Sequence, residues 1–260
     1  MTSSTTFTNK LRALAGASAL SAATLGLTGA AEARDFRLLS GWDSSYVAVD
    51  VLTSFIETLD EAVTEGFGVN VMGPETVPPF EQFDPVSRGL FDLLFTNGAY
   101  HFNQTSVGMA LDGLSGDTEA LREAGIWDAV DADYQEQGLK LIAVLYDLNG
   151  YHIMLNEPVG ENGLEGRRVR GTPIYHPAIN VLGGSPVVLP GGEIYPALER
   201  GVIDGAAWPT IGALSYRWFE VADYMMRPTF GQVGHLVLMN LDTWNDLSEE
   251  TRAEIETAAR

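Results

Sequence analysis

The chain has 260 residues, of which 45% are hydrophobic and 19% charged, a composition that supports a buried core and excludes an intrinsically disordered protein or a coiled coil. Acidic residues number 35 against 15 basic ones, and the formal charge of −20 argues against binding to nucleic acid or to anionic lipid. The absence of cysteine excludes disulfides, thiolate metal sites and cysteine nucleophiles.

The first 33 residues have the pattern of a secretory signal peptide. Lys10 and Arg12 precede an uncharged stretch at 13–31, and Ala31-Glu32-Ala33 supplies the small residues that signal peptidase requires. A membrane anchor is the alternative, but the stretch contains few large apolar residues and is only as long as the shortest bilayer-spanning helices. We therefore expect cleavage after Ala33 and a periplasmic mature protein.

Strands and helices alternate in the first part of the mature chain. Short apolar runs predict strands at 34–41, 69–72 and 91–95. Apolar residues at every fourth position predict a helix from Ser44 or Ser45 to Val63, and Pro78-Pro79 opens a second predicted helix that ends at Gly89. This alternation is typical of a parallel sheet covered by helices.

A second α/β unit is predicted to begin after Gly150. Before that point, the sequence predicts helices at 117–125 and 127–137 and a strand at 139–146. After it, the predicted elements are strands at 151–155, 167–170, 186–189 and 202–207 and a helix at 194–200. Because the strand pattern restarts, we predict an α/β fold of two units joined by chain crossings, and not one continuous sheet.

The motifs of common enzymes and cofactor sites are missing from the sequence. It contains neither the Gly-x-Ser-x-Gly of a nucleophile elbow nor a phosphate-binding Gly-x-x-x-x-Gly-Lys. Its histidines are scattered, without a second histidine at helical spacing: His101, His152, His176 and His235. We expect no metal ion, no cofactor and no enzymatic activity.

One arginine is a candidate ligand anchor. Arg167, Arg168 and Arg170 form a basic cluster, and the first two are interpreted as a solvated edge that offsets neighbouring acids. Arg170 ends its predicted strand directly before Gly171-Thr172-Pro173, where a side chain can turn into a cleft. Its planar guanidinium matches a carboxylate in two-point contact, so an anionic ligand is predicted there.

Aromatic residues follow the ends of other predicted strands. In open α/β sheets, ligands bind beyond the carboxyl ends of the strands, and aromatic side chains there suit the walls of a small-ligand pocket. Asn97 and Asn149 are the candidate hydrogen-bond donors of this pocket. The predicted wall residues are Trp42, Tyr100, Tyr151 and Trp208.

Several segments together resemble a known family. They are Gly166-Arg167-Arg168-Val169-Arg170-Gly171, Leu182-Gly183-Gly184-Ser185-Pro186-Val187, the run from Glu193 to Gly205, and the segment from Gly73-Pro74-Glu75 through Arg88-Gly89-Leu90-Phe91-Asp92. This pattern resembles the solute-binding proteins of TRAP transporters, the DctP-type extracytoplasmic subunits. The resemblance covers most of residues 34–247.

The resemblance implies a two-lobed, type II-like periplasmic binding protein with the ligand cleft between its lobes. It implies that Arg170 pairs with a ligand carboxylate and that Trp208 faces the ligand. Some keto-acid members carry a glutamate before this tryptophan, which helps to hold a cation. This chain has Ala207-Trp208 instead, so the aromatic wall is kept and no metal is expected.

The predicted function is capture of a small organic acid and its delivery to the membrane subunits of a TRAP-type transporter, without direct lipid binding. A periplasmic enzyme acting on an organic acid and a ligand sensor for a membrane receptor remain alternatives. The predicted limits are 1–33 for the signal peptide, 34–150 for lobe I, 151–225 for lobe II and 226–260 for a return to lobe I. Family members usually continue beyond a helix like that at 248–260, so the C-terminus is expected to be incomplete.

Overall fold

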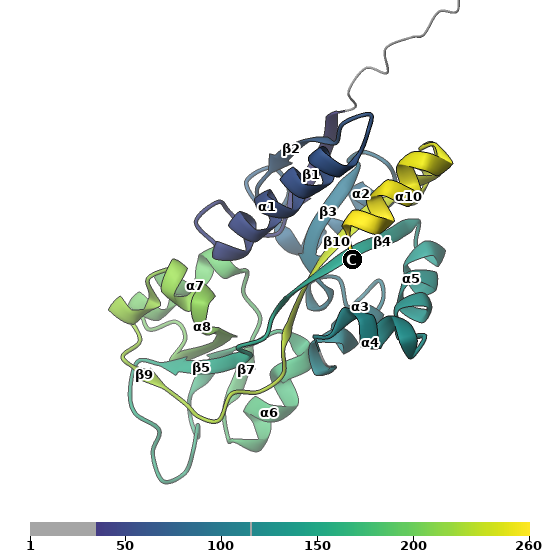
Figure 1. Ribbon diagram of the computed structural model, residues 1–260. Helices are drawn as coiled ribbons and strands as arrows, with labels where there is room; N and C mark the ends of the chain where they lie inside the picture. The colour runs from purple at the N-terminus through teal and green to yellow at the C-terminus, as the bar shows by residue number, and fades with distance from the viewer. Residues whose placement is uncertain (1–34, 115) are drawn as a thin grey trace, which may run out of the picture. The chain divides into compact units, whose positions relative to one another are not determined.

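Strands and helices alternate along the chain in the computed structural model, which describes residues 35–114 and 116–260 (Figure 1). The predicted signal peptide and its cleavage site lie outside the described residues. Within the described ranges, no helix is both long and apolar enough to cross a membrane.

The first sheet has the strand order β2-β1-β3-β10-β4. Its strands are β1 (Asp35–Ser40), β2 (Gly68–Met72), β3 (Leu93–Asn97), β4 (Leu139–Asp147) and β10 (Val233–Asn240). β1 pairs in parallel with β2 and β3, as the alternation of strands and helices predicts, whereas β10 is antiparallel to β3 and β4. The sheet is therefore mixed.

The second sheet has the strand order β7-β6-β8-β5-β9. Its strands are β5 (Tyr151–Leu155), β6 (Arg168–Arg170), β7 (Ser185–Val187), β8 (Gly205–Pro209) and β9 (Tyr224–Met225). β6 is parallel to β7 and β8, and β5 is antiparallel to β8 and β9. The chain crosses between the sheets from β4 to β5 and returns from β9 to β10 (Figure 1).

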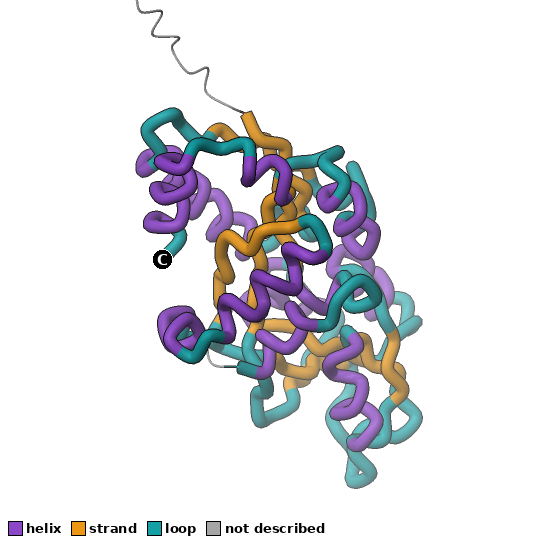
Figure 2. Tube along the Cα trace, turned by 90° about the vertical axis from the view of Figure 1, so that its right-hand side faces the viewer, coloured by secondary structure: helices purple, strands orange, loops and turns teal. Residues whose placement is uncertain are grey.

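Helices flank the strands of each sheet (Figure 2). The α-helices are α1 (Val47–Ala62), α2 (Phe83–Ser87), α3 (Val107–Ala110), α4 (Thr118–Glu123), α5 (Ile126–Glu136), α6 (His176–Val181), α7 (Gly191–Glu199), α8 (Thr210–Ser215), α9 (Leu241–Asn245) and α10 (Glu249–Ala258). Short 3-10 turns are η1 (Pro79–Glu81), η2 (Gly98–Tyr100), η3 (Leu111–Gly113), η4 (Pro173–Tyr175) and η5 (Trp218–Glu220). In the first lobe, α1 packs beside α10, and α5 packs against β4 (Figure 1). In the second lobe, α6 packs against β7.

Two predictions about local structure are wrong. The predicted helix at 78–89 is divided into η1 and α2, because Pro85 has no N–H to donate and cannot continue a helix from Glu81. α1 begins after Tyr46, which supplies no side-chain cap, and not after Ser44 or Ser45. Gly89 does have the positive φ of 75° expected where a helix ends.

A continuous apolar core joins the lobes. Trp42 and Tyr46 from the first lobe and Trp208 and Trp218 from the second belong to the same buried cluster. The Tyr46 and Trp208 rings meet edge to face at 5.8 Å between centroids. The lobes are therefore in direct contact around the ends of β1 and β8.

Candidate functional site

A small cavity lies where the ends of β1, β3, β6 and β8 converge. Six of the seven predicted site residues line it: Trp42, Asn97, Tyr100, Tyr151, Arg170 and Trp208. Its volume of about 20 Å³ is on the order of one water-sized sphere. The lobes are thus closed tightly around this point.

Arg170 is held deep in the cavity wall by the second lobe. It ends β6 between Val187 of β7 and Ala206 of β8, and it is 1% exposed. Its Nε donates to the Leu189 carbonyl oxygen at 2.8 Å, and its Nη1 donates to the Ala207 carbonyl oxygen at 3.2 Å. These bonds fix the guanidinium plane.

The remaining nitrogen of this guanidinium is unsatisfied. Nη2 of Arg170 is fully buried and has no hydrogen-bond partner of good geometry among the described residues. No carboxylate of the described residues forms an ion pair with it. Burial lowers the pKa of Arg170, while nearby Tyr100, Tyr151 and Tyr175 and a polar contact with the Tyr100 side chain raise it. A buried cation without a counter-ion is costly, so the site favours an anion at Nη2.

Aromatic rings surround the guanidinium. Its central carbon lies 4.6 Å from the centroid of the Trp208 ring, within the range of a cation–π contact. Trp42 donates from its indole Nε1 to the Tyr100 hydroxyl at 3.1 Å, and the centroids of these rings are 5.4 Å apart. Tyr151 adds a buried wall from the start of β5. The structure thus brings together the four aromatic residues predicted from the strand ends.

Neither asparagine offers a free amide donor to this cavity. Asn97 lines the cavity, but its Nδ2 donates to the Asp112 carboxylate and to the Gly234 carbonyl oxygen, so its donors are already used. Asn149 is exposed and lies outside the cavity, on the wall of a neighbouring pocket, and donates from Nδ2 to Asp147 at 2.9 Å. The cavity around Arg170 therefore offers fewer free amide donors to a ligand than the sequence predicts.

A buried acid that the sequence does not reveal connects the lobes. The Asp112 carboxylate, in η3 of the first lobe, accepts from Asn97 Nδ2 at 3.1 Å and from the Gly234 backbone N–H at 2.9 Å. From the second lobe, it accepts from the hydroxyls of Tyr151 at 3.2 Å and Tyr175 at 3.3 Å. Burial raises the pKa of Asp112 to about 6, although these hydrogen bonds lower it. In a chain this rich in acids, no pattern singles out Asp112.

The stability of the protein should therefore depend on the protonation of Asp112. The pKa of Asp112 in the folded protein is about 6, above its ordinary value of 3.8. Protonated Asp112 therefore adds its full stabilisation to the free energy of unfolding below about pH 4, and this stabilisation is lost as pH rises through 6. Between pH 4.5 and 7.5, the melting temperature of wild type should fall by a few degrees more than that of Asp112→Asn. This corresponds to a loss of roughly 1–3 kcal/mol in the free energy of unfolding. Differential scanning calorimetry measures this, with the exposed Asp223→Asn as control. An equal pH dependence in wild type and Asp112→Asn would contradict this assignment.

The buried histidines have structural partners. His235 shares a hydrogen bond between its Nε2 and the Tyr46 hydroxyl at 3.1 Å, and its Nδ1 lies 3.1 Å from the Leu145 carbonyl oxygen. Burial lowers the pKa of His235 to about 4, so its ring is neutral at pH 7. Nε2 of His101 lies 2.8 Å from the Tyr134 hydroxyl. Among residues 35–114 and 116–260, no group of three or more acids or histidines is placed to hold a metal ion.

Two known proteins of similar sequence are periplasmic binding proteins. The C4-dicarboxylate-binding periplasmic protein DctP of Rhodobacter capsulatus is 30% identical over 115 residues, which are 42% of this chain and 34% of that protein. The monocarboxylate 2-oxoacid-binding periplasmic protein of Nostoc sp. is 28% identical over 213 residues, 71% of this chain and 53% of that protein. The chain thus spans about a third to a half of the length of these curated relatives.

Solved structures share the two-lobed fold. A TRAP periplasmic solute-binding protein from Bradyrhizobium sp., in complex with galacturonate, has a TM-score of 0.75 at 22% identity, covering 87% of this chain and 78% of that chain. DctP7 of Bordetella pertussis, a solute receptor binding pyroglutamic acid, has a TM-score of 0.74 at 16% identity, with 87% and 77% covered. At this identity the likeness establishes the fold.

A family model matches the part of the chain that contains the arginine cluster at Arg167–Arg170. The model of the DctP family, bacterial extracellular solute-binding protein family 7, matches residues 113–260, more than half of the chain and the part that supplies Arg170 and Trp208. The chain therefore belongs to the DctP family of bacterial extracellular solute-binding proteins.

Proposed function

We propose that this protein captures a small carboxylate between its lobes, with Arg170 as the anchor, and releases it unchanged. The observation that carries the proposal is the Arg170 Nη2, which is buried in the cavity wall without a hydrogen-bond partner among the described residues. A carboxylate oxygen is the acceptor that best matches this donor, because the resulting hydrogen bond is charge-assisted. Trp208, Trp42, Tyr100 and Tyr151 would wall the bound acid.

Capture requires the lobes to move. The cavity of about 20 Å³ is smaller than an organic acid, so the lobes must stand further apart than in this structure to hold the acid. Closing over the bound acid would then exclude water around the ion pair. Exclusion of water strengthens the attraction between carboxylate and guanidinium. Binding and closure are therefore coupled.

The names of similar proteins support the ligand class. The relatives and solved structures described above bind dicarboxylates, 2-oxoacids, galacturonate and pyroglutamic acid, which are all organic acids. We infer that this chain works in the periplasm as the solute-binding subunit of a TRAP-type secondary transporter and hands its ligand to membrane subunits. This role requires binding without turnover.

A thermal-shift screen of the full chain tests the proposal. Each acid of a carboxylate library is paired with its neutral amide, so that only the charge and one donor differ. At a concentration 100 times its Kd, a cognate acid should stabilise the protein by about 2.7 kcal/mol and raise the melting temperature by several degrees. The acid should also be recovered intact after long incubation. If no acid stabilises the protein, or if amides do so equally, the proposal fails.

A further inference from the structure

The buried carboxyl group of Asp112 lies where the chain crosses between the lobes. The Asp112 carbonyl oxygen accepts from the Gln232 backbone N–H at 2.9 Å, and Gln232 belongs to the segment that returns from β9 to β10. The Asp112 side chain is bonded to Tyr151, the first residue of β5 after the other crossing. A movement of one lobe against the other bends both segments and therefore changes the surroundings of this carboxyl group.

The two oxygens of the Asp112 carboxyl group have partners in different lobes. Oδ1 accepts from the Gly234 backbone N–H at 2.9 Å and from Asn97 Nδ2 at 3.2 Å, and both donors belong to the first lobe. Oδ2 also lies 3.1 Å from Asn97 Nδ2, and it accepts from two hydroxyls of the second lobe, those of Tyr151 at 3.2 Å and Tyr175 at 3.3 Å. Oδ2 is therefore the oxygen at the boundary between the lobes.

The donors on these oxygens differ in whether they can also accept. An amide N–H can only donate, whereas a tyrosine hydroxyl can donate or accept. A proton on Asp112 is therefore best placed on Oδ2, where the hydroxyl of Tyr151 or Tyr175 can turn and accept it. No basic side chain in residues 35–114 and 116–260 forms an ion pair with Asp112. A proton is then the means of neutralising this buried group.

The tyrosines on Oδ2 connect Asp112 with the ligand cavity. The rings of Tyr151 and Tyr175 pack with their centroids 4.3 Å apart, and both pack against Phe230. Tyr151 lines the Arg170 cavity and donates its hydroxyl to Asp112, so the acid positions one wall of the candidate site. When the cavity widens to hold an organic acid, this contact is kept, because the lobes separate least beside the crossings.

We propose that Asp112 is a positioning residue for ligand capture: as the lobes close around an organic acid, Asp112 takes a proton from solvent onto Oδ2 and through it holds Tyr151 and Tyr175 of the second lobe. This inference rests on the proposed function and adds proton uptake to the closing step. Burial is the main reason that the pKa of Asp112 is about 6, and opening the lobes exposes the group and lets its pKa fall toward 3.8. The proton thus favours the closed state, and affinity for the acid is lost as pH rises through 6.

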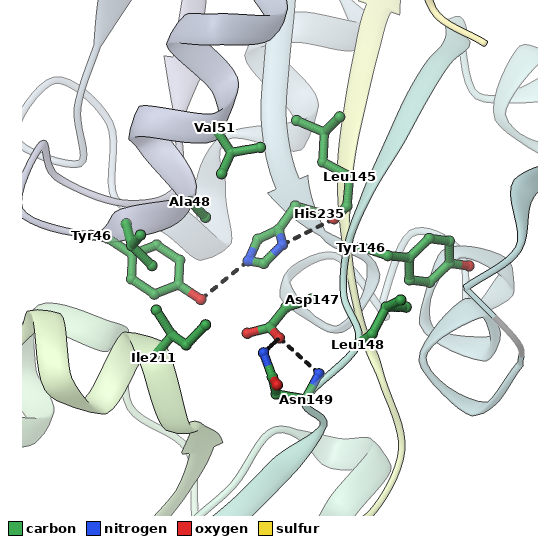
Figure 3. Close-up of a pocket in the computed structure, with 11 residues that line it drawn as sticks. Tyr46, Ala48, Val51, Leu145, Tyr146, Asp147, Leu148, Asn149, Ile211 and His235 are labelled. Carbon is green, nitrogen blue, oxygen red and sulfur yellow. Dashed lines mark hydrogen bonds between the residues drawn. The ribbon is translucent and has the colours of Figure 1, made fainter.

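Other titratable groups near Asp112 respond to the same movement. The tyrosines around it, which include Tyr134 of α5 and Tyr146 of β4, have pKa values raised by burial and stay protonated. His235 of β10 shares a hydrogen bond with the Tyr46 hydroxyl (Figure 3). Burial lowers the pKa of His235 to about 4, so its burial on closure would release a proton and oppose the effect of Asp112. Only the difference between wild type and Asp112→Asn isolates the carboxyl group.

Isothermal titration calorimetry in buffers of different ionisation enthalpy measures this difference. The probe is whichever of pyroglutamate, galacturonate and pyruvate binds wild type most tightly, or otherwise the best acid of the carboxylate library that stays ionised at pH 5. With pKa values of about 6 in the closed state and 3.8 in the open state, wild type should take up about 0.7 more protons than Asp112→Asn at pH 5.5. Relative to Asp112→Asn, its Kd should rise about tenfold between pH 5 and pH 7. The exposed Asp223→Asn should behave as wild type.

Tyr175→Phe supplies a second test, which decides the question even if Asp112→Asn does not fold. Tyr175 contacts Oδ2 but does not line the Arg170 cavity. Its hydroxyl partly offsets the rise that burial gives to the pKa of Asp112, so Tyr175→Phe should move the loss of affinity to higher pH. Equal proton uptake in wild type and Asp112→Asn, or the same pH profile in wild type and Tyr175→Phe, would overturn this inference and leave the proposed function intact. If no acid binds wild type at any pH, the proposed function itself fails.

Discussion

Replacing Arg170 by alanine should weaken binding of a cognate acid by about 2–5 kcal/mol, roughly a 30-fold to several-thousand-fold loss. The variant removes the cation that holds the carboxylate and leaves that carboxylate buried without its partner. Arg170→Lys should recover only part of the loss, because an ammonium keeps the charge but cannot reproduce the planar fork that Leu189 and Ala207 hold in place. Isothermal titration calorimetry with the best acid from the library measures both variants.

Arg168→Ala is the matched control for this prediction. Arg168 starts the same strand but is half exposed and pairs with Asp204 at 3.4 Å, away from the cavity. Its removal should change affinity by less than about 0.5 kcal/mol. Equal losses in Arg168→Ala and Arg170→Ala would show that the cluster acts through its overall charge. An unchanged affinity in Arg170→Ala would show that the anchor is wrongly assigned.

Closure of the lobes should be blocked by adding one methyl group at Gly212. A Cβ on this residue of α8 would collide with Nε1 of Trp208 and with the ring of Tyr46, which comes from the other lobe. Overpacking of this kind costs about 1–3 kcal/mol, so Gly212→Ala should lower ligand affinity roughly 5- to 150-fold. The loss arises because the contact between Tyr46 and α8 in the closed state is destabilised and because Trp208, which lies against Arg170, is displaced.

Gly113→Ala provides the control, because a Cβ at Gly113 meets nothing within 4 Å and its φ is not in the left-handed region. Calorimetry gives the affinities, and small-angle X-ray scattering with saturating acid gives the radius of gyration. Gly212→Ala should remain more expanded than Gly113→Ala and bind more weakly. Equal affinity and equal size in the two variants would contradict the role of the contact between Tyr46 and α8.

Strand positions were predictable where local periodicity and tertiary structure agree. The alternation at 34–95 correctly predicts parallel pairing of β1, β2 and β3. β10 was missed: its residues 233–240 were predicted only as a return segment. This strand lies between β3 and β4 and is buried along its whole length, so it lacks the polar–apolar alternation of a half-exposed strand. Its position depends on pairing with distant segments.

The candidate site likewise combines residues that local sequence indicates with residues whose role depends on distant segments. That Arg170 and four aromatic residues lie around one cavity could be predicted, because the ends of strands converge on one region of an α/β fold. Asp112 could not, since its importance comes from burial and from tyrosines of the other lobe. Asn149 follows a strand as predicted, yet the chain turns there toward the second sheet and leaves its side chain exposed.

A crystal structure of the full chain with the best acid from the library tests the central claim most directly. One carboxylate oxygen should lie about 2.7–2.9 Å from Nη2 of Arg170, with Trp208 and Tyr100 against the ligand. A carboxylate bound elsewhere, with Nη2 of Arg170 still lacking a partner, would contradict it.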